Sequence, residues 1–290
     1  MTQVSFARYR HAIEKRLLPR RWLRSLEIRR EASALAALEK RICTVDTLRS
    51  ADDALIRSWL EADLTSEWRQ VEATMATIRF GGGSGAVNPG DRRALYHLAR
   101  ALRPNRVLEV GTHVGASTSM LALALTQSQA HALDVKPRLV TVDISDVNDP
   151  LLGAWHRIGC SRSPAEVMRA IGCQDFVQFV TSPSIPYLQG CTERFDLIFL
   201  DGDHSATAVY QEIPAALRLL NPGGLILLHD YFPNLKPLWS DDALVPGPDL
   251  AVGRLRAECA SIVARPFGAL PWPTKLDSNV SSLALLCRTE

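Results

Sequence analysis

One segment near the middle of the chain restricts its fold more than any other. Arg106–Thr118 reads RVLEVGTHVGAST, an apolar strand with Glu109 near its end, a turn with two glycines, and the start of a helix at 116–118. Open α/β sheets form a ligand-binding crevice where a buried strand leads through a glycine turn into a helix N-terminus. The segment therefore predicts an α/β fold with a binding site at the end of this strand.

The spacing of small residues in the turn limits what the crevice binds. A dinucleotide fingerprint has the pattern G-x-G-x-x-G/A, in which the middle glycine lets bare backbone approach a pyrophosphate. Gly111 and Ala116 fit the outer positions, but His113 occupies the middle one. The turn is thus poorly suited to a pyrophosphate, which argues against a nicotinamide oxidoreductase.

Strands and helices alternate along the chain from Pro89 onward. The capping box Ser163-Pro164-Ala165-Glu166 indicates a helix start, and the apolar run 195–200 is typical of a strand buried on both faces. The expected strands are 106–110, 138–143, 176–180, 195–200 and 225–228, with a late antiparallel strand within 282–287. We therefore expect a doubly wound, mostly parallel sheet, which binds ligands at the carboxyl ends of its strands.

The first 80 residues have a different pattern. Apolar residues at helical spacing over Trp22–Leu38, and two further amphipathic stretches, predict helices without a strand signal. The cluster Gly81–Gly85 that follows is typical of a flexible joint. We expect a helical cap or lid over residues 1–80, a glycine-rich hinge over 81–90 and the main α/β domain over 91–290.

Charge is unevenly distributed along the chain. Residues 1–50 hold twelve Lys and Arg against five Asp and Glu, whereas the other 240 residues hold 21 against 26. The basic segment is either a solvated helix face or a contact surface for an acidic partner. The start of the chain lacks the apolar core of a secretory leader, no uncharged run resembles a membrane span, and six cysteines form no C-x-x-C pair. We therefore expect a cytoplasmic protein with free thiols and no membrane contact.

Four features occur in the order found in class I methyltransferases that depend on S-adenosylmethionine (SAM). They are EVGTHVGAST after the first strand, Asp143 at the end of the second, FDLIFLDGDH at the fourth and LNPGGLILLHDY at the fifth. Together they resemble the O-methyltransferase branch of that class, which includes macrolide-sugar and catechol-type enzymes. The resemblance covers about residues 86–287 and implies a Rossmann-like fold.

This resemblance assigns the SAM site to the carboxyl ends of the first four strands. The glycine turn would contact the methionine part of SAM, which carries no phosphate. Asp143 stands where a carboxylate can accept both ribose hydroxyls, and Ser182 stands where relatives contact adenine. The residues implied in SAM binding are Glu109, Gly111, Thr112, His113, Gly115, Ser117, Asp143, Ser182 and Asp201.

Asp201-Gly202-Asp203-His204 lies where the fourth strand opens into the expected pocket. Similar enzymes use the first acid here as a metal ligand, and some use a histidine three residues later as a base, which implies Asp201 and His204. Histidine suits proton transfer because its ordinary pKa lies near neutral pH. A positioned base contributes roughly 10²–10⁴-fold to a rate.

His229 and Asp230 end the fifth strand, where catechol-type enzymes carry Asp-Asn and bind Mg²⁺ with both residues. A histidine in the first place weakens the expectation of Mg²⁺, because this ion prefers oxygen ligands. Asp201 and Asp230 are candidate ligands for Mg²⁺ or for a softer divalent cation. A metal-free site, with His204 or His229 as the base, is equally open.

The sequence thus predicts an enzyme that transfers a methyl group from SAM to a hydroxyl of a small molecule, such as a metabolite in natural-product biosynthesis. An alternative is a SAM-consuming cyclase or lyase that releases methylthioadenosine. An RNA methyltransferase is disfavoured, because the net charge is only +2 and LDGDH stands where N-P-P-[YF] is typical. The acceptor is not encoded in any motif, and the helical cap is a candidate surface for a homodimer.

Overall fold

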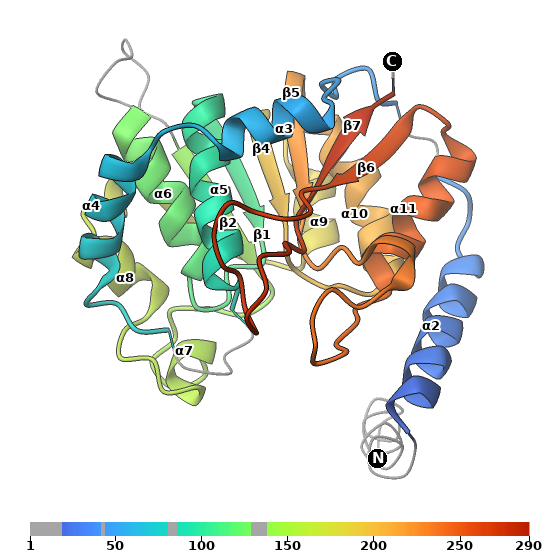
Figure 1. The fold of residues 1–290 in the computed structure, drawn as a ribbon, viewed down its shortest axis with the longest axis horizontal. Coiled ribbons are helices and arrows are strands. Elements are labelled where there is room, and N and C mark those ends of the chain that lie inside the picture. Colours follow the sequence, from blue (N-terminus) through green and yellow to red (C-terminus); the bar gives the residue numbers. More distant parts are fainter. Residues whose placement is uncertain (1–18, 42–43, 81–85, 129–137, 290) are drawn as a thin grey trace.

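Seven strands form one sheet at the centre of the molecule (Figure 1). The computed structural model describes residues 19–41, 44–80, 86–128 and 138–289. The strand order is β3-β2-β1-β4-β5-β7-β6, and the pairs are parallel except β5–β7 and β7–β6, which are antiparallel. The strands are β1 Arg106–Val110, β2 Arg138–Asp143, β3 Val177–Thr181, β4 Phe195–Leu200, β5 Leu220–Leu228, β6 Ile262–Pro266 and β7 Ala284–Arg288. The predicted doubly wound, mostly parallel sheet is confirmed.

Alternate side chains of the central strands belong to two different cores. Val107 and Leu197 pack with the helices on one face of the sheet, whereas Leu108 and Ile198 pack with those on the other. All four side chains are fully buried. Because successive residues of a strand point to opposite faces, a strand covered on both sides is mostly apolar. This explains the apolar runs of β1 and β4.

Helices cover both faces of this sheet (Figure 1). Residues of α3, α4, α5, α6 and α8 join one core, and residues of α2, α9, α10 and α11 join the other. Within the described part of the chain, no helix combines the length and the apolar character needed to span a membrane. The helices are α2 Arg20–Ala36, α3 Asp53–Leu60, α4 Thr65–Met75, α5 Pro89–Leu102, α6 Ala116–Ser128, α7 Ala154–Arg157, α8 Pro164–Ala170, α9 Ser184–Gly190, α10 Ala206–Arg218 and α11 Gly247–Glu258, with short 3₁₀ turns at Gln174–Phe176 and Pro233–Leu235.

The N-terminal helices pack on both sides of the α/β sheet. Trp59 of α3 and Val71 of α4 are buried in the core that α5 shares, and Arg100 of α5 forms an ion pair with Glu67 of α4 at 2.5 Å. Helix α2 lies apart from them, against α10 and α11 (Figure 1). The predicted joint at 81–85 lies outside the described residues, so the division into cap, hinge and domain stays a prediction.

Several elements differ from the sequence-based expectation. Strand β5 begins at Leu220, five residues before the expected start at 225, and its pairing with β4 is irregular near Phe195. Helices α9 and α11 and strand β6 were not predicted. The sequence of α11, GPDLAVGRLRAE, contains two glycines, which are weak helix formers, and a proline in the first turn, where proline is tolerated. Its helix is stabilised instead by buried contacts with α10.

A buried acid joins β1, β2 and α6. Glu109 is fully buried, and its Oε2 accepts hydrogen bonds from Oγ1 of Thr118 (2.5 Å) and Oγ1 of Thr141 (2.6 Å). Burial raises the pKa of Glu109 to about 7, although bonds from Ser117, Thr118 and Thr141 act in the opposite direction. Glu109 therefore keeps its proton at mildly acidic pH in the folded protein.

Replacing Glu109 with glutamine should change how stability depends on pH. The folded-state pKa of about 7 exceeds the ordinary value of 4.5, so this group stabilises the fold fully below its ordinary pKa and loses that contribution as the pH rises through its folded pKa. Between pH 5 and 6.5 we expect the free energy of unfolding of the native protein to fall by about 2 kcal/mol more than that of Glu109→Gln.

Urea denaturation of both proteins at these two pH values measures the difference. The other buried acids and histidines are present in both proteins and therefore affect the two curves equally. An identical pH dependence in the two proteins would contradict the raised pKa of Glu109.

Candidate active site

The ends of β1, β4 and β5 are fixed side by side because backbone pairing continues beyond the strands. The amide of Asp201 donates to the carbonyl of Val110 (2.8 Å), and the amide of His229 donates to the carbonyl of Leu200 (3.1 Å). Strands β1 and β4 are also the neighbours between which the strand order changes direction. Open α/β sheets bind their ligands at such a switch point.

Gly111 makes the close contact between the glycine turn and β4. Its φ angle is +97°, which L side chains rarely adopt, and a Cβ atom at this position would lie 2.0 Å from the carbonyl oxygen of Asp201. The amide of Gly111 donates to the carbonyl of Val142 in β2 (2.8 Å). The turn is therefore held against the strands on both of its sides, and only glycine fits there.

A cavity of about 620 Å³ opens at this edge of the sheet, which is an ordinary size for a small-molecule site. Two residues that the sequence assigned to SAM binding do not line it. Glu109 lies in the buried joint between β1, β2 and α6, and Gly115 packs against Pro164. The predicted site residues that do line the cavity are Gly111, Thr112, His113, Ser117, Asp143, Ser182, Asp201 and His204.

Asp143 is oriented by the backbone around it. Its Oδ2 accepts a hydrogen bond from the amide of His113 (3.0 Å), and its Oδ1 accepts one from the amide of Ser145 (2.9 Å). His113 itself has a φ of +50°, in the left-handed region. Each carboxylate oxygen can accept a further bond, so Asp143 is able to receive two hydroxyl groups of a ligand.

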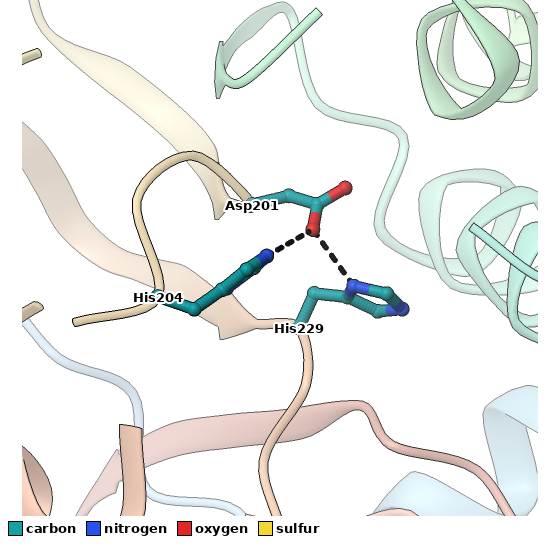
Figure 2. A group of neighbouring side chains, drawn as sticks. All are labelled: Asp201, His204 and His229. Atoms are coloured by element: carbon teal, nitrogen blue, oxygen red, sulfur yellow. Dashed lines mark ion pairs between the residues drawn. The ribbon is translucent and has the colours of Figure 1, made fainter. Parts of the chain in front are cut away.

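Two histidines converge on one carboxylate oxygen (Figure 2). Oδ1 of Asp201 lies 2.7 Å from Nδ1 of His229 and 3.6 Å from Nε2 of His204. His204 is partly exposed and lines the cavity, whereas His229 is buried and does not. The structure thus brings the three predicted catalytic residues together, and of these only Asp201 and His204 face the cavity.

The second nitrogen of His229 faces Asp91, a fully buried acid near the start of α5. Oδ2 of Asp91 lies 3.6 Å from Nε2 of His229. The same oxygen accepts hydrogen bonds from Nδ2 of Asn88 (2.7 Å) and from Oγ of Ser282 (3.1 Å). Burial alone would raise the pKa of Asp91, but the neighbouring His229 and hydrogen bonds from the Ser281–Ser282 segment lower it.

Charge around His229 outweighs its burial. Desolvation acts to lower the pKa of this imidazole, but the neighbouring carboxylates of Asp201, Asp230 and Asp91 raise it well above its ordinary value. The carboxylates around His229 therefore favour the protonated form of its imidazole.

Asp230 lies beside both histidines. Its oxygens are 3.7 Å from Nε2 of His204 and 3.7 Å from Nδ1 of His229. Among the described residues, Asp201, His204 and His229 form a group whose ligand atoms all lie within 4.8 Å of one another. Asp230, which the sequence suggested as a metal ligand with Asp201, is not a member of this group.

Some residues of the site were not predicted from the sequence. Asp91 lies in Asn-Pro-Gly-Asp, which reads as an ordinary helix start, and Asn88 does cap α5, so nothing local indicated a contact with His229. Ile144 and Ser184 also line the cavity. Ile144 is 74% exposed, and an apolar residue directly after Asp143 was the local signal that could have indicated a lining residue.

Comparison with known proteins gives matches along the same segment. Residues 108–231 match the methyltransferase domain family. The O-methyltransferase hkm8 of Aspergillus hancockii is 28% identical over 145 residues, which is 50% of this chain and 50% of that protein. A catechol O-methyltransferase of Niastella koreensis is 30% identical over 159 residues, 53% of this chain and 62% of that protein. The chain therefore spans 50% and 62% of the lengths of these relatives.

Solved structures share the fold at low sequence identity. Cofactor-bound Rv0187 from MTB has a TM-score of 0.51 at 23% identity, covering 82% of this chain and 96% of that one. The O-methyltransferase TomG from Streptomyces achromogenes, in complex with SAM, has a TM-score of 0.50 at 19% identity, covering 79% and 91%. These likenesses confirm the Rossmann-like fold.

The family match begins within β1 and ends just after β5. It includes the glycine turn, Asp143, the LDGDH segment and the His229-Asp230 pair, which are the four features that first indicated the resemblance. Residues 108–231 therefore match a methyltransferase domain, and the resemblance of the chain to class I O-methyltransferases is confirmed.

Proposed function

We propose that this protein transfers the methyl group of SAM to a hydroxyl of a small molecule. One observation carries the proposal: a single cavity is lined by Gly111 and Asp143, which match the SAM positions of the resemblance, and by Asp201 and His204, which can receive a proton. The methyltransferase family match over residues 108–231 supports the same activity.

The residues around the cavity fit SAM. Asp143 would hold the ribose, Ser182 would contact the adenine, and the turn at Gly111 and Ser117 would hold the methionine part. The carboxylates of Asp143 and Asp201 give the cavity a negative lining, which suits a cationic ligand. When bound, SAM supplies an activated methyl group, because its sulfur carries a positive charge.

In this proposal His204 takes the proton of the acceptor hydroxyl. It lines the cavity, whereas His229 is enclosed by acids. Asp201 and Asp230 lie 3.6 Å and 3.7 Å from Nε2 of His204, where they stabilise the imidazolium that proton transfer produces. The remaining work of the protein is to align the acceptor with the methyl group and to exclude water.

The group Asp201, His204 and His229 offers one oxygen and two imidazole nitrogens. This set suits a transition-metal ion such as Zn²⁺ or Mn²⁺ better than Mg²⁺. An ion held there would supply a Lewis acid for the acceptor oxygen. We propose that the reaction proceeds without one, because Asp201 and His229 already pair with each other at 2.7 Å.

The first test identifies what becomes of SAM. We expect the protein, incubated with methyl-labelled SAM and 3,4-dihydroxybenzoate as a probe acceptor, to release S-adenosylhomocysteine (SAH) and a methylated phenol, which mass spectrometry detects. Prior treatment with EDTA should leave the rate within about two-fold, whereas loss of activity that Mn²⁺ or Zn²⁺ restores would show a metal site. Methylthioadenosine would indicate the cyclase or lyase alternative, and absence of SAM binding in calorimetry would contradict the proposal altogether.

Replacing Asp143 with asparagine should weaken SAH binding about ten-fold, because hydroxyls bonded to a charged acceptor lose about 1.5 kcal/mol when that charge is removed. Isothermal titration calorimetry with SAH measures the dissociation constant. Asp146→Asn, at an exposed acid three residues further along the same loop, is the matched control and should bind like the native protein. Equal affinities of the native protein and Asp143→Asn would contradict the ribose role.

Replacing His204 with glutamine should lower kcat by about 10²–10⁴-fold, the contribution of a positioned general base. The dissociation constant of SAH should stay within about two-fold, because the proposed base acts on the acceptor. His156→Gln, at an exposed histidine outside the cavity, controls for the substitution itself. Native kcat in His204→Gln would assign the base to another group.

A further inference from the structure

One face of α2 contacts helices α10 and α11 of the α/β domain. Arg24, Glu31, Leu35 and Leu38 follow one another at spacings of seven, four and three residues, which place them along one side of a helix and its extension. Leu35 is buried and Leu38 packs against the same core. Arg254 of α11 holds the end of the helix, because its guanidinium donates to the carbonyls of Leu35 and Leu38.

The same face reaches the loop that carries His204. Oε2 of Glu31 accepts a hydrogen bond from the amide of Ala206 at 2.6 Å. Ala206 is the first residue of α10 and is fully buried. Amides in the first turn of a helix lack a partner within that helix, and a carboxylate near a helix N-terminus is favourable. Glu31 therefore fixes the backbone two residues after His204.

The other side of this loop is closed by α11. A Cβ atom on Gly247 would lie 1.9 Å from the carbonyl oxygen of His204 and 2.6 Å from the amide nitrogen of Ala206. Within the loop, Oδ1 of Asp203 accepts a bond from the amide of Ser205 at 2.8 Å. The backbone from 204 to 206 is thus held between α2 and the start of α11, with little room to move.

A second contact of α2 reaches the segment that follows β5. The guanidinium of Arg24 donates to the carbonyl of Asp242 (3.1 Å) and lies 3.5 Å from its carboxylate. Arg24 and Glu31 are two helical turns apart on the same face. One N-terminal helix thus contacts both segments that follow the catalytic strands β4 and β5.

We propose that Glu31 is a positioning residue for His204, and that the docked α2 helix keeps this side chain in its reactive position. The inference rests on the proposed function, in which His204 is the base. Small errors in the placement of a reacting group cost large factors in rate, and such groups need support from a second layer of contacts. Glu31 acts through the backbone of the loop and has no contact with the cavity of its own.

The experiment compares Glu31→Ala and Glu31→Gln with the native full-length chain. Glu27→Ala is the matched control, because Glu27 is an exposed acid one turn earlier on the same helix. Three measurements are made: amide hydrogen exchange by NMR, the dissociation constant of SAH by calorimetry, and kcat and KM with SAM and 3,4-dihydroxybenzoate. The amide of Ala208 is an internal control, because it is bonded to Oγ of Ser205 rather than to α2.

In Glu31→Ala we expect the amide of Ala206 to exchange at least about ten-fold faster, with little change at Ala208. We expect kcat to fall about ten-fold while the dissociation constant of SAH changes by less than about two-fold. Glu31→Gln should recover most of both losses, because its amide oxygen still accepts the bond. Glu27→Ala should match the native protein in every measurement.

Unchanged exchange at Ala206 in Glu31→Ala would overturn the proposal, and so would faster exchange with native kcat. An equal loss of SAH affinity and kcat would also overturn it, because that pattern indicates general unfolding. If the native protein does not methylate the probe, the proposed function fails in that assay. Exchange at Ala206 still decides whether Glu31 holds the loop, so the two failures are distinguishable.

Discussion

The contact between Gly111 and Asp201 determines the geometry of the site. A Cβ atom on residue 111 would lie 2.0 Å from the carbonyl oxygen of residue 201, so any other residue would force β1 and β4 apart at their ends. The amide of Asp201 in turn pairs with β1, and the amide of His229 pairs with β4. The glycine turn and the ionisable residues are thus connected through backbone alone. Groups held in this way keep their separation more strictly than groups placed on loops.

The two histidines next to Asp201 illustrate how surroundings separate identical side chains. His229 has Asp201 on one ring nitrogen and Asp91 on the other, and the acids raise its pKa despite burial. His204 lines the cavity, and its nearest acids lie at 3.6 Å and 3.7 Å. One imidazole therefore serves as a counter-ion for buried carboxylates, and the other is accessible to a ligand. His229 is the histidine that stands in place of an acid at the end of β5. It acts as a counter-ion because Asp91 lies opposite its second ring nitrogen.

The parts of the fold and site that depend on local sequence were predictable. Three such features depend only on residues close together in the sequence, and the structure places each as expected. They are the apolar runs of β1 and β4, the capping box at Ser163 and the acid that ends β2. Contacts between distant segments were not predictable. Asp91 reads as part of a helix start, and α11 contains two glycines and packs against α10. Glu31 has no local signal that connects it with Ala206.

The unpredicted contacts have a common origin outside the segment that matches the methyltransferase family. Asp91 reaches His229 from α5, on one face of the sheet, and Glu31 reaches the loop of His204 from α2, on the other. Both elements precede residue 108, where the family match begins. The matched segment thus holds the glycine turn and the ends of β4 and β5 together through backbone contacts, whereas α5 and α2 contact His229 and the loop of His204 from outside it. A substitution in α2 or α5 can therefore alter the surroundings of His229 and His204 without changing any residue of the glycine turn at Gly111.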